Sequence, residues 1–199
     1  MKIKRLVGGN LESNGYIVYD KEGGEGYIID PGYRGEAFIA ECEALELAIK
    51  GLLLTHHHYD HVGAVDRLKK QWDCPVYLHR DDCDGYKKPV DTMLLGGERF
   101  RIGDESLLTI HTPGHTKGGV CFLSESPRSK AAFTGDTIFD TDLGRTDLAG
   151  GSLRDMERTV KEIISGWGND MTIYPGHGDC ATMKYVRQHN QEYLDLLQG

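Results

Sequence analysis

The sequence predicts one layered α/β domain that spans residues 1–199. Short apolar runs typical of strands cluster in both halves of the chain, and segments with helical spacing follow them. No low-complexity linker separates the halves, and 199 residues are enough for one domain with a sizeable core. Strands in both halves with helices outside them indicate an α/β sandwich.

The first half alternates glycine-rich turns with short strands and then turns to helices. Three strands are expected over residues 3–7, 16–19 and 27–29. Phe38, Cys42, Leu45 and Ile49 recur at helical spacing and predict an amphipathic helix over residues 36–50. A buried strand is then expected over 52–54 and a second helix over 62–72, packed through Val62, Val65, Leu68 and Trp72.

The second half repeats this style. Strands are expected over residues 100–102, 107–111, 120–123, 131–133 and 171–174. Ser152 and Asp155 have the spacing of a capping box and open a helix whose apolar set is Leu153, Met156, Val160 and Ile163. A final helix carries Val186, Tyr193, Leu194 and Leu197 on one side.

The least regular segment, residues 81–97, is expected to be a surface loop over one end of the sandwich. Loops of this length are often functional, so Tyr86 and residues 87–89 could line a substrate entrance. A plain surface loop is the interpretation that we favour for them.

Composition and charge exclude several classes of partner. The formal charge is −8 and the basic residues are scattered, so nucleic acid is not expected as a partner. No apolar run approaches the roughly 20 residues that cross a bilayer, and the N-terminus lacks the apolar segment of a signal peptide. We therefore expect no membrane partner, a cytoplasmic location and a small-molecule substrate. Five cysteines without a C-x-x-C pair favour small buried thiols over disulfides or a cysteine-based zinc site.

One stretch, LLLTHHHYDHVGAV, crowds four histidines and an aspartate into residues 56–61 directly after an apolar run. In extended backbone alternate side chains share a face, so His56, His58 and Asp60 are expected to project together while His57 points away. His61 falls at the turn into the next helix and can reach a different ion. The pattern indicates two adjacent metal sites rather than an exposed loop.

Three later loops, each after an expected strand, add further ligands. His115 follows a Pro-Gly turn in HTPGHTKGG, Asp136 ends a buried strand in FTGD, and His177 follows Pro-Gly in YPGHGD. The carboxylate of Asp136 is able to bridge two cations. Neutral imidazoles with carboxylates suit zinc, iron or manganese, whereas calcium and magnesium would want fewer histidines.

These four motifs, opening with THHHYDH, resemble the signature of the metallo-β-lactamase fold superfamily over essentially the whole chain. The resemblance implies a four-layer αβ/βα sandwich with the site at one edge between the two sheets. It also implies one metal held by His56, His58 and His115, a second held by Asp60, His61 and His177, and Asp136 bridging both.

Other polar residues have alternative interpretations. The segment YIIDPG resembles a family motif whose aspartate supports the site from outside the ligand set, so Asp30 is a candidate for that role, with a plain turn as the alternative. His57 occupies a variable position of the motif. His79, His111 and His189 lie outside the motifs and are expected to be structural or surface residues.

The ligand set predicts hydrolysis. Two cations about 3.5 to 4 Å apart would share a bridging water and lower its pKa from about 15.7 toward about 7, which supplies hydroxide at neutral pH. That hydroxide would attack a carbonyl polarised by one metal. Asp60 is the expected catalytic residue, because it would orient the hydroxide and could accept its proton.

Within the superfamily, the segment GDTIFDTDLGRTDLAGG is similar to glyoxalase II-like proteins, which hydrolyse thioesters of the hydroxyacylglutathione type. Two departures accompany this resemblance. True glyoxalase II enzymes have a C-terminal helical domain without a counterpart here, and they carry Lys and Tyr where this sequence has Arg145 and Asp147. Arg145 could bind a substrate carboxylate, or it could form an ion pair with Asp142 or Asp147.

A second function has the same ligands. Persulfide dioxygenases share this fold and the GRTD segment, and the resemblance to them implies a single iron held by His56, His115 and Asp136. The metal count and identity would separate the two activities. A metal-binding module without catalysis is disfavoured, because it would leave the open positions of both metals unused.

Overall fold

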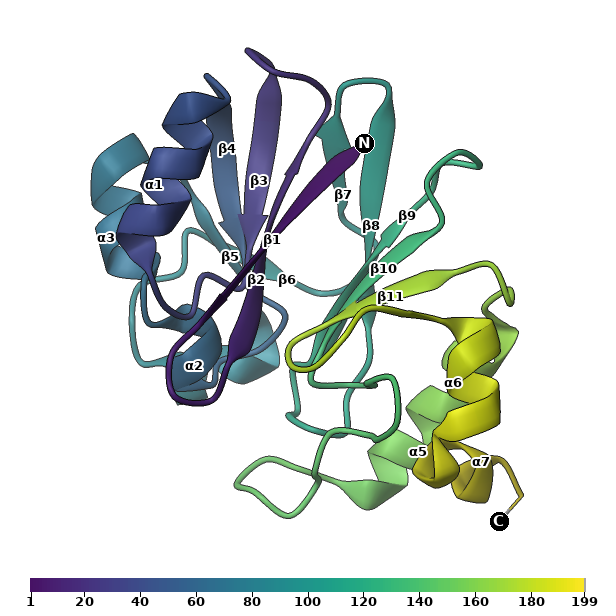
Figure 1. Cartoon of the computed structure of the whole chain (residues 1–199). Coiled ribbons are helices and arrows are strands. Elements are labelled where there is room, and N and C mark those ends of the chain that lie inside the picture. Colours follow the sequence, from purple (N-terminus) through teal and green to yellow (C-terminus); the bar gives the residue numbers. More distant parts are fainter. Residues whose placement is uncertain (199) are drawn as a thin grey trace.

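The computed structural model describes residues 1–198, and in this range two six-stranded sheets pack face to face with helices on their outer sides (Figure 1). The chain therefore has the four-layer αβ/βα sandwich that the sequence predicted. The helices α1 and α3 cover the first sheet, and α5, α6 and α7 cover the second (Figure 1).

The first sheet has the order β1-β2-β3-β4-β5-β6. Its strands are β1 (Lys2–Gly8), β2 (Ser13–Tyr19), β3 (Glu25–Ile29), β4 (Ala48–Leu53), β5 (Val76–His79) and β6 (Thr92–Leu94). β1 to β3 are antiparallel, whereas β3 to β6 run parallel. Parallel neighbours need crossover connections, and the helices supply them.

The second sheet has the order β12-β11-β10-β9-β8-β7 and is antiparallel except for β10 and β11. Its strands are β7 (Arg99–Ile102), β8 (Glu105–His111), β9 (Val120–Ser124), β10 (Ala131–Gly135), β11 (Thr172–Pro175) and β12 (Ala181–Thr182). The helices of the chain are α1 (Gly35–Ala44), α2 (Tyr59–Val62), α3 (Val65–Trp72), α4 (Cys83–Tyr86), α5 (Leu153–Glu162), α6 (Met183–His189) and α7 (Gln191–Gln198), with 3₁₀ turns at Arg80–Asp82 and Ile164–Gly166.

Alternation along the strands builds the core. In β2, Ile17 packs on the helix side of the first sheet, while Tyr16 and Val18 face the second sheet. Phe122 and Phe133 of the second sheet complete that inner layer. Because every residue of β2 is buried, this strand is held from both sides and fixes the first sheet against the second.

The prediction of a helix over residues 36–50 is wrong for its last third. It ends at Ala44, Glu46 adopts a left-handed φ of 53°, and β4 begins at Ala48. The backbone N–H of Leu47 donates to the carbonyl of Cys42, a bond that closes a helix end. The residue that ends a helix in the left-handed conformation is commonly glycine or asparagine. Because glutamate stands at position 46, the sequence did not indicate a helix end there.

Two other expected helices are divided. The helix expected over 62–72 starts earlier, at Tyr59, and is interrupted after Val62, where Ala64 N–H donates to the carbonyl of Pro31. The C-terminal helix is divided into α6 and α7 at Asn190. In α5, Ser152 accepts the N–H of Asp155 as expected, but Leu153 is 61% exposed and does not belong to the apolar face.

The segment 81–97 is not a simple surface loop. It contains α4 and β6, and it buries Asp82 and Tyr86. The ring of Tyr86 packs in the core on the helix side of the first sheet rather than at a substrate entrance. Lys88 is exposed and its ammonium lies 2.7 Å from the carboxylate of Asp66 in α3, so residues 87–89 lie beside α3.

The cysteines match the sequence-based expectation. All five are free, with Cys42, Cys74 and Cys121 buried and Cys83 and Cys180 half-buried. Within residues 1–198 no helix combines the length and the apolar character that a membrane span requires.

Candidate metal centre

The seven candidate ligands come from four segments that meet where strands end. His56 and His58 follow β4, and Asp60 and His61 lie in α2. The other three stand between β8 and β9, after β10 and after β11, and are His115, Asp136 and His177. Backbone hydrogen bonds from Val120 to Thr55 and from Asn14 to Gly176, at 2.9 and 2.7 Å, join the two sheets at this point.

One cluster contains three imidazoles. A nitrogen of each of His56, His58 and His115 lies within 4.8 Å of the others. His58 Nδ1 and His115 Nε2 are 2.9 Å apart, and the ring of His56 stands edge-on to both. The rings therefore point their nitrogens at one place.

The second cluster contains Asp60, His61 and His177. His61 Nε2 lies 3.3 Å from His177 Nε2 and 3.3 Å from Asp60 Oδ2. His177 Nε2 lies 3.1 Å from the same carboxylate oxygen. One carboxylate and two imidazoles thus converge beside the first cluster.

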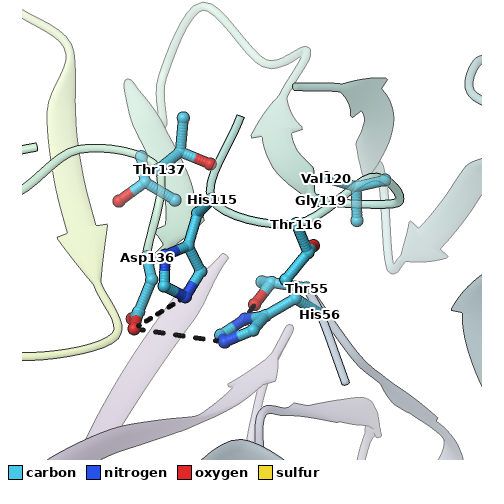
Figure 2. A pocket seen from close by; sticks show the side chains of 9 residues that line it. Thr55, His56, His115, Thr116, Gly119, Val120, Asp136 and Thr137 are labelled. Carbon is cyan, nitrogen blue, oxygen red and sulfur yellow. Dashed lines mark hydrogen bonds and ion pairs between the residues drawn. The ribbon is translucent and has the colours of Figure 1, made fainter. Parts of the chain in front are cut away.

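Asp136 lies between the two clusters. Its Oδ2 is 3.6 Å from His115 Nε2 and 4.0 Å from His56 Nε2, and Figure 2 shows both rings directed at this carboxylate. On the other side, its Oδ1 is 3.3 Å from His61 Nε2 and its Oδ2 is 3.6 Å from His177 Nε2. A single carboxylate therefore contacts members of both clusters.

The outward nitrogens of three rings are held by oxygen atoms. His115 Nδ1 lies 2.7 Å from the carbonyl of Arg145, and His177 Nδ1 lies 2.9 Å from the carbonyl of Leu11. His56 Nδ1 lies 3.1 Å from the hydroxyl of Thr55. Such partners fix the orientation of a ring and leave its other nitrogen free for a metal.

Asp30 supports the site as the resemblance suggested. Its carboxylate accepts the N–H of Thr55 at 2.7 Å and the hydroxyl of Thr55 at 2.5 Å, and lies 3.4 Å from His61 Nδ1. Asp30 also has a left-handed φ of 47°, so the turn interpretation holds for its backbone. Through Thr55 and His61 it touches both clusters.

The clusters differ in their protonation. Burial, with His61 nearby, lowers the pKa of His56 well below its ordinary range, and burial with His115 nearby lowers the pKa of His58 to about 4. Burial opposes the charge of His61 and His177 too, but Asp136 and Asp60 outweigh it and raise the pKa of both rings. These pKa shifts favour neutral rings at His56 and His58, and charged rings paired with carboxylates at His61 and His177.

Two expectations about side-chain direction had different outcomes. His56 and His58 share a cluster and His57 points away, as alternation in extended backbone predicted. Asp60 does not join them, because the backbone turns helical at Tyr59 and carries it to the second cluster. That assignment agrees with the one that the family resemblance implied.

Arg145 lies beside the site but its guanidinium is paired. Its Nε and Nη2 donate to the two oxygens of Asp147 at 2.7 and 2.8 Å. This favours the ion-pair interpretation, with Asp147 rather than Asp142 as the partner. The backbone carbonyl of Arg145, which holds His115, is the part that contacts the candidate ligands.

The remaining histidines lie outside both clusters. The rings of His79 and His111 stack with centroids 4.1 Å apart and an angle of 9° between their planes. Parallel rings do not direct their lone pairs at one point, although Asp81 lies nearby. His111 Nε2 faces the carbonyl of Lys117 at 2.9 Å, and His189 stacks on Tyr185. That these three histidines are structural or surface residues therefore stays a prediction.

Sequence reasoning missed one buried group near the site. Asp82 is 1% exposed and its carboxylate lies 2.9 Å from His57 Nδ1. No local pattern indicates its burial, because Asp82 stands in an irregular, charged segment that has the composition of a surface loop.

Known proteins resemble this chain in sequence and in fold. A solved structure of the B3 metallo-beta-lactamase BLEG-1 superposes with a TM-score of 0.89 at 29% identity and covers 100% of both chains. TTHA1623 in a di-iron-bound form has a TM-score of 0.82 at 31% identity over 94% of this chain and 98% of that one. A curated protein of Schizosaccharomyces pombe, called a probable hydroxyacylglutathione hydrolase, is 31% identical over 96% of this chain and 74% of its own length.

The family profile of the metallo-beta-lactamase superfamily matches residues 8–177. This range contains all seven candidate ligands and the strands from β2 to β11. By this match and by the fold, the chain belongs to the metallo-beta-lactamase superfamily.

Proposed function

We propose that this protein is a metallo-hydrolase that holds two divalent metal ions and cleaves thioesters of the hydroxyacylglutathione type. The observation that carries the proposal is the position of Asp136 between two separate clusters of metal-ligating side chains.

The spacing of the side chains fits metal ions. Zinc bonds to histidine are about 2.0–2.1 Å long, so ligand atoms in a tetrahedron stand roughly 3.3 Å apart. The contacts of His61 Nε2 with the other second-cluster atoms and with Asp136, at 3.3 Å each, match that separation. His56 Nε2 and Asp136 Oδ1 are buried without a hydrogen-bond partner, which a bound ion would satisfy.

The ligand assignment follows from the clusters. In the proposed site, one ion would be held by His56, His58 and His115 and the other by Asp60, His61 and His177, and Asp136 would be available to both. Zinc suits this donor set best, and iron and manganese are also compatible with it. The likeness to TTHA1623 in a di-iron-bound form supports two ions at such a site.

Two ions bound in this way would supply Lewis acidity and lower the pKa of a coordinated water toward about 7. Asp60 is the residue that we propose to orient that water and to accept its proton, because an ionised carboxylate is an acceptor only. The hydroxyl of Ser13 donates to the backbone carbonyl of Asp60 at 2.8 Å and fixes its backbone. The His115 and His177 rings are held by backbone carbonyls, so the site is assembled before a substrate arrives.

The substrate class rests on similarity. The relative from Schizosaccharomyces pombe is named for hydroxyacylglutathione hydrolysis, and the GRTD segment resembles the same group. The alternative is a persulfide dioxygenase with one iron held by His56, His115 and Asp136. Because the dioxygenases share the same ligand residues, the number and identity of the bound metal ions distinguish the two activities.

The test combines elemental analysis with three assays on one sample of purified protein. We expect two metal ions per chain, cleavage of S-lactoylglutathione, no oxygen uptake with glutathione persulfide and no opening of a β-lactam ring. One iron per chain with oxygen uptake would instead establish the dioxygenase, and lactam turnover without thioester cleavage would replace the proposed substrate class.

A pair of variants tests the role of Asp60. Asp60→Ala should abolish thioester cleavage, whereas Asp66→Asn, which changes an exposed carboxylate of α3, should leave it unchanged. Metal content is measured on both variants. Full activity in Asp60→Ala would reject the proposed role.

A further inference from the structure

A buried carboxylate outside both clusters joins the segments that carry the first cluster. Asp82 ends the 3₁₀ turn that follows β5 and is 1% exposed. An ionised group in such a place is costly unless several donors satisfy it. Its partners therefore indicate what it holds together.

All of its hydrogen bonds reach the two ligand-bearing segments. Asp82 Oδ2 accepts the backbone N–H of His57 at 3.1 Å and lies 2.9 Å from His57 Nδ1. The same oxygen accepts the hydroxyl of Thr116 at 2.9 Å, and Oδ1 accepts the N–H of Gly118 at 2.7 Å. His57 stands between His56 and His58 in the chain, and Thr116 follows His115 directly.

The packing at this junction is close. A Cβ placed on Gly118 would lie 2.7 Å from the backbone nitrogen of Asp82 and 2.8 Å from its Oδ1. A Cβ on Gly85 of α4 would lie 2.4 Å from the ring of His57. Glycine at these two positions allows the segments to approach this closely.

The second cluster has different supports. Ser13 binds the carbonyl of Asp60, Asp30 lies beside His61, and the carbonyl of Leu11 faces His177. Among the described residues, the hydrogen bonds of Asp82 go to neither Asp60, His61 nor His177. An effect of Asp82 should accordingly be confined to the first cluster.

We propose that Asp82 is a positioning residue that fastens the segment of His56 and His58 to the loop of His115 and so preorganises the first of the two metal sites. The assignment of these three histidines as ligands rests on the proposed function. Preorganisation reduces the ordering cost that a metal would otherwise meet on binding. Groups that hydrogen-bond to a metal ligand typically change the metal affinity 10- to 100-fold. Asp82 acts through residues next to the ligands, so its effect should lie at the lower end of that range.

The test is metal binding to the stripped protein, which needs no substrate. Stepwise Co²⁺ and Zn²⁺ affinities are measured by competition with a chromophoric chelator, and the Co²⁺ absorption bands report the geometry of each site. His58→Gln and His177→Gln identify which step belongs to the first and which to the second site. Asp82→Asn keeps the size of the side chain and places amide hydrogens opposite donors.

We expect Asp82→Asn to weaken the first site about 10-fold, to change its Co²⁺ bands, and to leave the second site within about twofold. Asp91→Asn is the matched control, because the carboxylate of Asp91 accepts the N–H of Val76 in β5 but contacts no ligand segment. It should lower the melting temperature and leave both affinities unchanged.

Two outcomes would overturn the proposal: a folded Asp82→Asn protein with both affinities intact, or one in which both sites weaken equally. If Asp82→Asn does not fold, Thr116→Val removes one of the same hydrogen bonds and is judged by the same criteria. A wild-type protein that binds a single metal would defeat the dinuclear proposal. In that case, weaker metal binding in both His58→Gln and Asp82→Asn would support the Asp82 proposal, and unchanged binding in Asp82→Asn would contradict it.

Discussion

The two clusters on either side of Asp136 are built by different means. The first consists of three imidazoles from two segments, which Asp82 joins. The second includes the carboxylate of Asp60 and draws its supports from the N-terminal strands, through Leu11 and Ser13. A dication gains more electrostatic attraction at the second cluster, whereas the first depends more on geometry. The clusters should therefore respond differently to substitutions around them, except where a residue serves both.

The largest effect should come from the shared ligand. Asp136→Asn removes the negative charge that faces His115 on one side and His61 on the other. We expect both metals to be lost and thioester cleavage to fall by more than the 10- to 100-fold that supporting residues cost. Metal analysis after dialysis and the activity assay check this, with Asp142→Asn as an exposed control. Retention of one tightly bound metal would mean that Asp136 serves a single cluster.

A substitution at Gly176 should disturb the second cluster by contact alone. A Cβ at this position would lie 2.2 Å from Asp136 Oδ1 and 2.6 Å from His61 Cε1. One or both ligands must move, so Gly176→Ala should lower metal affinity and reduce the free energy of unfolding by about 1–3 kcal/mol. Gly166→Ala is the control, because a Cβ there meets nothing within 4 Å. Chemical denaturation and metal titration measure the two effects, and unchanged values for Gly176→Ala would show that the site can adjust.

Asp30 tests whether one support can serve both clusters. Its carboxylate bonds to Thr55, whose hydroxyl meets His56, and lies directly beside His61. Asp30→Asn should weaken both sites about 10- to 100-fold, the second more than the first. Asparagine tolerates the left-handed φ of 47° at this position, so the backbone should not confound the result. Stepwise metal affinities measure both effects. A loss of affinity confined to the first site would mean that the contact of Asp30 with His61 does not support the second site.

The sequence predicted the ligands better than their supports. Dense histidines after an apolar run and Pro-Gly turns at strand ends are local signals, and they pointed to residues that the fold brings together. Asp82 and Leu11 act through hydrogen bonds between segments 34 and 166 residues apart, which no local pattern records. The same limit explains the helix expected over 36–50. The apolar residues keep helical spacing beyond Ala44, although the backbone leaves the helix and adopts a left-handed conformation at Glu46. The spacing alone therefore does not indicate where the helix ends.

The smallest effect concerns protonation in the metal-free protein. The pKa of His58 is lowered to about 4, because burial and His115 disfavour its charge. The unfolded chain therefore binds this proton more readily between about pH 4 and the ordinary value of about 6.5, and stability rises with pH over that window. Burial opposes the charge of His177, but the hydrogen bond to Asp60 outweighs it and raises the pKa. The stabilisation that protonated His177 contributes is thus present below about pH 6.5 and is lost as the pH rises through the pKa of His177 in the folded state.

Replacement of His58 and of His177 should consequently change the pH dependence of the free energy of unfolding in opposite ways. His58→Gln should flatten the rise of the unfolding free energy between about pH 4 and 6.5, and His177→Gln should reduce its decline above about pH 6.5. Denaturant titrations of the stripped variants across this range measure both slopes. Identical pH profiles for the two variants would mean that the clusters do not differ in charge, and the electrostatic distinction between them would have to be abandoned while their geometric one remained.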